Sequence, residues 1–228
     1  MNKVISISLM LMLMLMLMLM LMLMLSACSS DDVETANFGS DYYKSDYQLV
    51  NATNLELDFY MANSELDGDE RDPFKDKYKV AHITKEEGTK QIRHEHNAER
   101  KVNFYVHAPY ANKAGYRETH KVKRDRHYQW LAWMSGEALS HSLFEKYESN
   151  REGYIRVRLF ATDTALQANN SGQTLALTIG KVSEFISVDQ CNGGLQVNGM
   201  PINLCDTSFG RSYLLVVGDE GRISLALQ

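Results

Sequence analysis

Apolar and polar residues alternate along much of the chain after residue 47. In five segments, every second residue is Leu, Ile, Val, Phe or Met: 55–61, 102–107, 155–160, 174–179 and 223–227. Alternation with period two is typical of half-buried antiparallel strands. With so many short strands, the sequence predicts a mainly β fold, an antiparallel β-sandwich of one large or two small domains.

Three segments depart from this alternation. The stretches "HYQWLAWM" (127–134) and "SYLLVVG" (212–218) are apolar on both faces, which favours central strands. In the third, Leu139, Leu143 and Tyr147 follow the spacing of a helix, which predicts a short amphipathic helix near 138–148.

Trp130 and Trp133 lie three residues apart, so in a strand their side chains face opposite sides. One of them belongs in the core. The other is either a platform for a glycan or protein partner, or is covered by a second packed sheet.

Two pairs of segments suggest an internal repeat. The stretch that begins at Tyr47 resembles the stretch that begins at Tyr154. Tyr128 and Tyr213 each end an Arg-x-Tyr sequence, and each is followed by a similar apolar run and a Gly close to an acidic residue. We therefore expect β-sandwich domains or halves at 47–146 and 154–228. They follow a polar segment, 28–46, which has the composition of a flexible tether.

The first 27 residues are dominated by Leu-Met repeats. Residues 4–25 are apolar all round and, as a helix of about 33 Å, could cross a bilayer core. However, the run ends in Leu25-Ser26-Ala27-Cys28, which resembles the lipobox of bacterial lipoproteins. The resemblance implies that residues 1–27 are a cleaved signal peptide and that Cys28 carries covalent lipid. Because Ser29 follows instead of Asp, it also implies the outer membrane of a Gram-negative bacterium.

An uncleaved, single-pass anchor helix is the alternative, because this apolar run is longer than an ordinary signal core. Under either interpretation Lys3 places the amino terminus on the cytoplasmic side and the rest of the chain outside the inner membrane. The lipid anchor would give membrane attachment without any transmembrane segment, since two or three acyl chains hold firmly.

The mature part also resembles uncharacterised immunoglobulin-like repeat domains of bacterial surface proteins. The resemblance rests on Leu49-Val50-Asn51-Ala52-Thr53, on Leu57-Asp58-Phe59-Tyr60, and on the strand 213–218. It implies a β-sandwich in the cell envelope and no known activity.

The charge balance bears on possible partners. The chain has 24 basic and 29 acidic residues, and removal of the leader with Lys3 leaves a net charge of -6. An acidic chain argues against nucleic acid as a partner. The basic segment 120–127 is either a solvated turn or a contact for lipid A phosphates or an anionic glycan. We expect the membrane as one partner, and an envelope protein or glycan as another.

Two cysteines remain beside Cys28. An exported protein can pair Cys191 with Cys205, and Asn198-Gly199 midway between them favours a hairpin turn that brings the thiols together. A metal site at this pair is the alternative, but metals normally need more ligands nearby.

The histidines are confined to positions 82–141. His94 and His96 flank Glu95, so in a strand both rings point to one side, as a metal-chelating pair requires. His107, His120 or His127 could supply a third ligand. The alternative is that "RHEHNAER" is a solvated, charged turn or edge strand.

Other chemistry is not supported by a motif. The acidic stretch with Asp67, Asp69 and Asp72 lacks the full pattern of a calcium loop. The sequence has no Gly-x-Ser-x-Gly and no phosphate-binding glycine loop. It therefore favours a structural or binding role over an enzymatic one, with no cofactor other than the lipid on Cys28. The alternative is a metal-binding envelope protein or a metal-dependent enzyme that uses the His-rich region.

Overall fold

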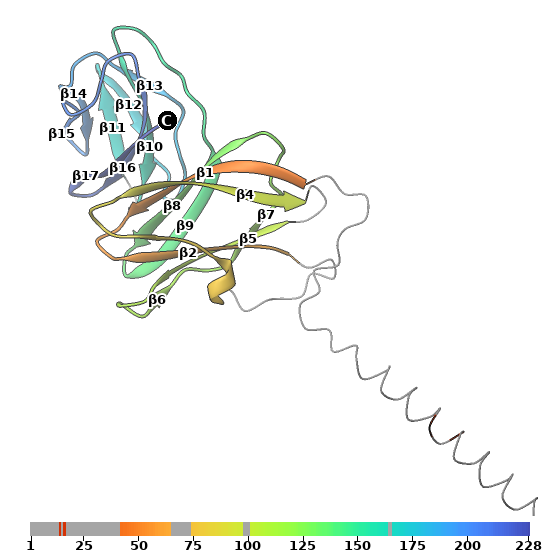
Figure 1. The fold of residues 1–228 in the computed structure, drawn as a ribbon. Helices are drawn as coiled ribbons and strands as arrows, with labels where there is room; N and C mark the ends of the chain where they lie inside the picture. The colour runs from red at the N-terminus through yellow and green to blue at the C-terminus, as the bar shows by residue number, and fades with distance from the viewer. Residues whose placement is uncertain (1–13, 15, 17–41, 65–73, 98–100, 164–165) are drawn as a thin grey trace, which may run out of the picture. The chain divides into compact units, whose positions relative to one another are not determined.

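The computed structural model describes residues 14, 16, 42–64, 74–97, 101–163 and 166–228. Within these residues no helix is both long and apolar enough to span a membrane. From residue 42 onward, the regular secondary structure of the described residues is β-strand apart from one 3-10 turn, and it forms two successive halves, each with two facing sheets (Figure 1). The fold is therefore mainly β and of the sandwich type, as the alternation predicts.

The first half, residues 42–145, has two sheets, with strand orders β4-β1-β8-β9 and β3-β2-β5-β6; β7 also pairs with β5. Its elements are β1 (Tyr42–Ala52), β2 (Leu57–Asn63), a 3-10 turn (Asp76–Tyr78), β3 (Lys79–Ile83), β4 (Thr89–Asn97), β5 (Val102–Ala108), β6 (Lys113–Ala114), β7 (Glu118–His120), β8 (His127–Ser135) and β9 (Ala138–Glu145). The core between the sheets is aromatic: Trp130 packs edge-on against Phe59 and Phe104 at about 5 Å.

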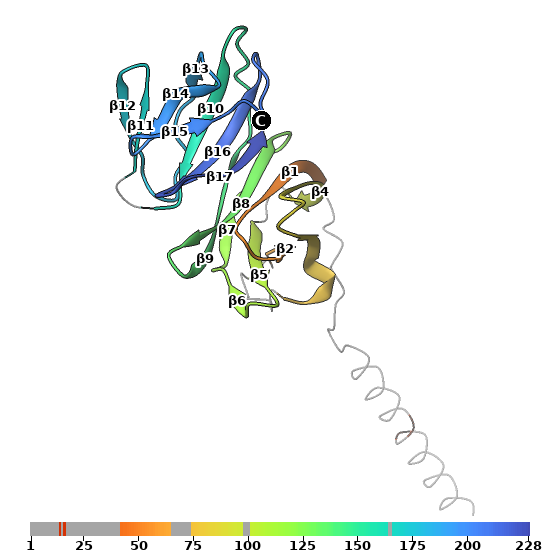
Figure 2. The same cartoon turned by 90° about the vertical axis from the view of Figure 1, so that its left-hand side faces the viewer.

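The second half, residues 155–228, repeats this arrangement with sheets β13-β10-β16-β17 and β12-β11-β14-β15. Its strands are β10 (Ile155–Ala161), β11 (Gln167–Asn170), β12 (Gln173–Ala176), β13 (Ile186–Val188), β14 (Asn192–Val197), β15 (Met200–Asn203), β16 (Ser212–Gly218) and β17 (Gly221–Leu227). Its core is mainly aliphatic. Figure 2 shows β10, β16 and β17 side by side in this half.

Two tyrosines establish which residues of the halves are equivalent. The backbone N–H of Lys123 donates to the Tyr128 hydroxyl, and that of Ser208 donates to the Tyr213 hydroxyl, both at 2.9 Å and both from five residues upstream. Tyr128 then pairs in parallel with Tyr47, and Tyr213 with Val157. Tyr47 is thus equivalent to Val157, three residues beyond the Tyr154 that the sequence repeat suggests.

The structure corrects three details of the predicted fold. The sandwich is not purely antiparallel, because β1 pairs in parallel with β8 and β10 with β16. The first strand starts at Tyr42, so the predicted tether 28–46 extends five residues too far. Only residues 174–176 of the predicted strand 174–179 are in a strand, β12.

The helix expected near 138–148 is wrong, because residues 138–145 form strand β9, paired with β8. Leu139 and Leu143 fit the helical period, but with the buried His141 between them they also fit a period of two. Because the buried residue between the two leucines is a histidine, the period of two cannot be recognised from the apolar residues alone.

The halves meet through the outer faces of their central strands. Val50, Leu131 and Trp133 of the first half pack against Phe160 and Val216 of the second. Trp133 contacts the Phe160 ring edge-on at 5.4 Å. The strands that are apolar on both faces, β8 and β16, are central as predicted, and each has one face in its own sandwich and one at this junction.

A buried arginine also joins the halves. The guanidinium of Arg158 on β10 donates to the backbone carbonyls of Glu145 and Ser183 and lies over the Tyr147 ring at 4.5 Å. Burial lowers the pKa of Arg158 from its ordinary value. The two carbonyls and the π face of Tyr147 replace part of the hydration that Arg158 loses on burial. The contacts at the junction therefore stabilise this buried charge.

Candidate functional site

The lipidation residue predicted from the sequence, Cys28, lies outside the residues that the structure describes, as does the predicted signal peptide apart from Met14 and Met16. The acidic stretch with Asp67, Asp69 and Asp72 also lies outside them. The anchor therefore stays a prediction from the lipobox.

The predicted disulfide between Cys191 and Cys205 is present. It closes the β14–β15 hairpin, whose turn residues Asn198 and Gly199 both have positive φ angles, 49° and 79°. Those angles are the ones a type I′ hairpin turn requires. The sulfurs are thus a structural staple, and the alternative of a metal site at the two thiols is excluded.

The proposed metal ligands His94 and His96 lie on β4, an edge strand, and both face the interior of the first sandwich. On the neighbouring β1, Tyr43 pairs with His96, Ser45 with His94, and Tyr47 with Ile92. Ser45, Tyr47 and His96 are fully buried, and His94 is largely buried. The prediction that both rings point to one side is confirmed, while the picture of a wholly solvated segment applies only to the outward residues such as Arg93 and Glu95.

These side chains form an unusual polar cluster. Six of the eight buried side-chain atoms that lack a hydrogen-bond partner, among those described, belong to five residues at this end of the sandwich: Ser45, Tyr47, Asn63, His94 and His96. Asn63 lies at the end of β2, and its amide donates to the Glu95 carbonyl across the sandwich at 3.4 Å. We call these five residues the polar cluster.

Burial controls the protonation of the cluster. Desolvation, helped by the neighbouring His96, lowers the pKa of His94 to about 4. Desolvation also lowers the pKa of His96, against the opposing effect of the nearby backbone of His94 and Val122. Burial raises the pKa of Tyr47. At neutral pH the cluster therefore contains two neutral imidazoles and a neutral phenol.

The suggested third histidine ligands do not join this pair. His127 is exposed and lies 3.5 Å from the Asp46 carboxylate, His120 lies 3.1 Å from Glu118, and His107 packs on the Phe74 ring. Within the described ranges no group of three or more His, Cys, Asp or Glu side chains is arranged to hold a metal ion. A metal at His94 and His96 would need water or hydroxyl oxygens to complete its coordination.

His141 is a buried histidine that the sequence did not single out. Its Nδ1 accepts a hydrogen bond from the Trp130 indole N–H at 3.2 Å, and its Nε2 donates to the Tyr116 carbonyl. Burial lowers its pKa. Because both nitrogens have partners, His141 is a satisfied core residue, in contrast to His94 and His96.

The basic segment 120–127 forms β7's last residue, a loop and the first residue of β8. Lys121, Lys123, Arg124 and Arg126 are exposed in that loop, while Val122 is buried. The solvated-turn interpretation thus describes the geometry, and contact with phosphates stays a prediction.

Trp133 is no exposed platform. Its side chain is buried at the junction between the halves, and a Cβ at Gly180 would lie 3.3 Å from its ring. The second-sheet interpretation of this residue is the correct one.

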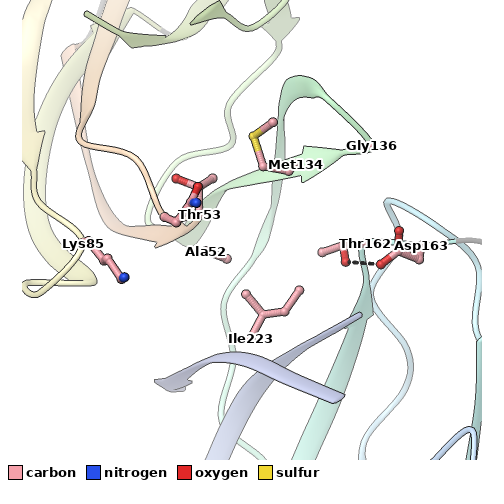
Figure 3. A pocket seen from close by; sticks show the side chains of 9 residues that line it. Ala52, Thr53, Lys85, Met134, Gly136, Thr162, Asp163 and Ile223 are labelled. Carbon is pink, nitrogen blue, oxygen red and sulfur yellow. Dashed lines mark hydrogen bonds between the residues drawn. The ribbon is translucent and has the colours of Figure 1, made fainter. Parts of the chain in front are cut away.

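A groove of about 390 Å³ lies at the junction (Figure 3). Lys85 of the first half and Asp163 of the second lie at its opposite ends, and Met134 and Ile223 provide apolar surface between them. The Thr162 hydroxyl donates to Asp163 at 3.1 Å. The groove therefore offers one amine, one carboxylate and one hydroxyl for polar contacts.

Comparison with protein-family models finds no match, and no curated protein is similar enough to the chain to indicate its function.

Proposed function

We propose that this chain is a lipid-anchored outer-membrane lipoprotein that presents a paired β-sandwich as a binding or structural module in the cell envelope. The single observation that carries the proposal is the motif Leu25-Ser26-Ala27-Cys28 at the end of a long apolar leader. A peptidase site of small residues directly before a cysteine is what lipid attachment and cleavage require.

The disulfide supports this location. Cys191 and Cys205 are paired in the structure, and such pairs persist in oxidising compartments such as the periplasm but are rare in the cytosol. A staple in a small hairpin is thus consistent with export of everything that follows the leader.

The paired sandwich suits a binding or structural role. Its buried charged residue Arg158 is used at the junction, and the groove with Lys85 and Asp163 is the surface where we place recognition of an envelope protein or glycan. Mixed apolar and charged linings of this kind are common where one protein contacts another or a polar ligand.

Radiolabelled palmitate tests the anchor directly. Cells that express the full chain should incorporate label into this protein, and Cys28→Ser should abolish incorporation and release the protein from the membrane fraction. The double variant Cys191→Ser/Cys205→Ser is the matched control, because it removes the two disulfide-bonded cysteines and should keep the label.

Two results would contradict the proposal. Label that persists in Cys28→Ser would place the lipid elsewhere. A Cys28→Ser protein that stays membrane-bound and retains residues 1–27 would establish the alternative, a single-pass protein held by its apolar leader.

A further inference from the structure

The polar cluster has an internal reference in the second half of the same chain. Because Tyr47 is equivalent to Val157, Ser45 and its partner His94 correspond to Ile155 and its partner Val188. Ile155 and Val188 are both fully buried in the second core. The same pair of positions is therefore apolar in one half and polar in the other.

This difference shows that the scaffold does not need the polar residues. An apolar pair fills the equivalent position and leaves no unsatisfied atoms there, whereas a buried polar atom without a partner has lost its hydrogen bonds to water and gained none in the fold. Buried unsatisfied groups in native proteins call for an explanation such as a bound ion or ordered water. The first half retains a costly group of them at one place.

The donor set indicates which ligand fits. His94 and His96 occupy alternate positions of one strand, about 6.6 Å apart along it, with both rings on the inner side. Imidazole nitrogens bind zinc and copper at about 2 Å. Calcium and magnesium prefer oxygen ligands and fit this pair poorly.

The surroundings supply the remaining features of a metal site. The hydroxyls of Ser45 and Tyr47 are buried and lie near each other on the inner face of β1, where Ser45 pairs with His94. They can hold water that is bound to the metal. The backbone of Val122 lies close to the His96 ring, where a carbonyl can take the N–H of the nitrogen that does not face the metal.

We infer that His94 and His96 bind one divalent transition metal of the zinc–copper class, with water held by the Ser45 and Tyr47 hydroxyls completing its coordination. The site is confined to the first half. It is independent of the lipid anchor, so failure of one proposal leaves the other standing.

Metal titration of the full chain in detergent tests the site. After removal of metals with a chelator, the protein should bind one equivalent of Zn²⁺ by calorimetry. Bound Cu²⁺ should give an electron paramagnetic resonance spectrum with couplings from two imidazole nitrogens. His94→Val should weaken binding by at least about tenfold, a loss that removal of even an outer-shell partner can cause, and should remove one nitrogen coupling.

The variants are chosen so that folding and binding can be separated. Ser45→Ile/His94→Val reproduces the apolar pair of the second half and should fold while losing the site. His107→Ala removes a histidine elsewhere in the first half and should bind like the wild type. Absence of binding by the wild type, or equal binding by wild type and His94→Val, would overturn the inference.

Discussion

The two halves of the chain bury different chemistry within the same strand order. In the second half, β10 and β13 bring Ile155 against Val188 inside an aliphatic core. In the first, β1 and β4 bring Ser45 against His94. Since the topology is common to both, the difference lies in the side chains and not in the fold. The comparison separates what the scaffold requires from what the first half has added to it.

A second difference concerns how each half is stabilised. The first half has a dense aromatic core around Trp130, whereas the second combines smaller aliphatic side chains with the disulfide. The disulfide lies in the half with the smaller core residues. The features shared by the halves, such as Tyr128 and Tyr213, should instead contribute equally.

The largest effect is expected from the centre of the first core. Trp130→Ala should lower the free energy of unfolding by about 3–5 kcal/mol, because it removes a fully buried ring that packs on Phe59 and Phe104. Leu215→Ala, at the equivalent position of β16, is the matched variant and should cost less because it leaves a smaller cavity. Denaturant unfolding measures both, and a larger cost for Leu215→Ala would contradict the account of the two cores.

Loss of the disulfide should come next. Cys191→Ser/Cys205→Ser opens a loop with a sequence separation of 14 and should lower the free energy of unfolding by about 3 kcal/mol. Hydrogen exchange should rise first in β14 and β15, with β1 and β4 protected as before. Equal loss of protection in both halves would show that the staple acts on the whole module.

Acid should distinguish the halves, because histidines occur only in the first. The pKa of His94 is about 4 when folded and 6.5 in an unperturbed chain, so between these values the unfolded state binds the extra proton. Stability from this group is complete above about pH 6.5 and falls as the pH drops towards 4, by up to about 3 kcal/mol.

Unfolding by urea at several pH values within this window measures that loss. His94→Val should flatten the dependence while the contribution of the carboxylates remains. An unchanged slope in His94→Val would show that His94 is not held neutral by burial.

The smallest effects should come from the shared tyrosines. Tyr128→Phe and Tyr213→Phe each remove a hydroxyl that accepts a backbone N–H at 2.9 Å, and each should cost about 1 kcal/mol. Thermal melts of the two variants should agree closely. A large difference between them would mean that the hydroxyls have different roles and would weaken the alignment of the halves.

Much of this fold could be predicted from the sequence, because alternation with period two reports directly which side of a strand is buried. It identified strands at Leu57–Met61 and Val102–Val106, and apolar runs identified the central strands β8 and β16. Parallel pairing of β1 with β8 could not be predicted, since a strand's pattern of residues does not specify the direction of its neighbour. β9 was missed because His141 is buried at an inward position.

The polar cluster was predictable only in part. The spacing of His94 and His96 correctly placed both rings on one side, but a sequence cannot show which side of an edge strand faces the core. Ser45 and Tyr47 were not identified, because the cluster depends on the pairing of β1 with β4. Their place in the cluster follows from the strand register, which puts the apolar residues Ile155 and Val188 at the positions of Ser45 and His94 in the second half.

Exchange of the polar pair for its apolar counterpart tests the central claim most directly. The free energy of unfolding of Ser45→Ile/His94→Val should be measured beside the wild type, without metal and with Zn²⁺. Without metal the variant should be more stable by about 1–3 kcal/mol, because buried polar atoms without partners are removed. Zn²⁺ should stabilise the wild type and leave the variant unchanged. A variant that is less stable without metal, together with an equal effect of Zn²⁺ on both proteins, would contradict the account.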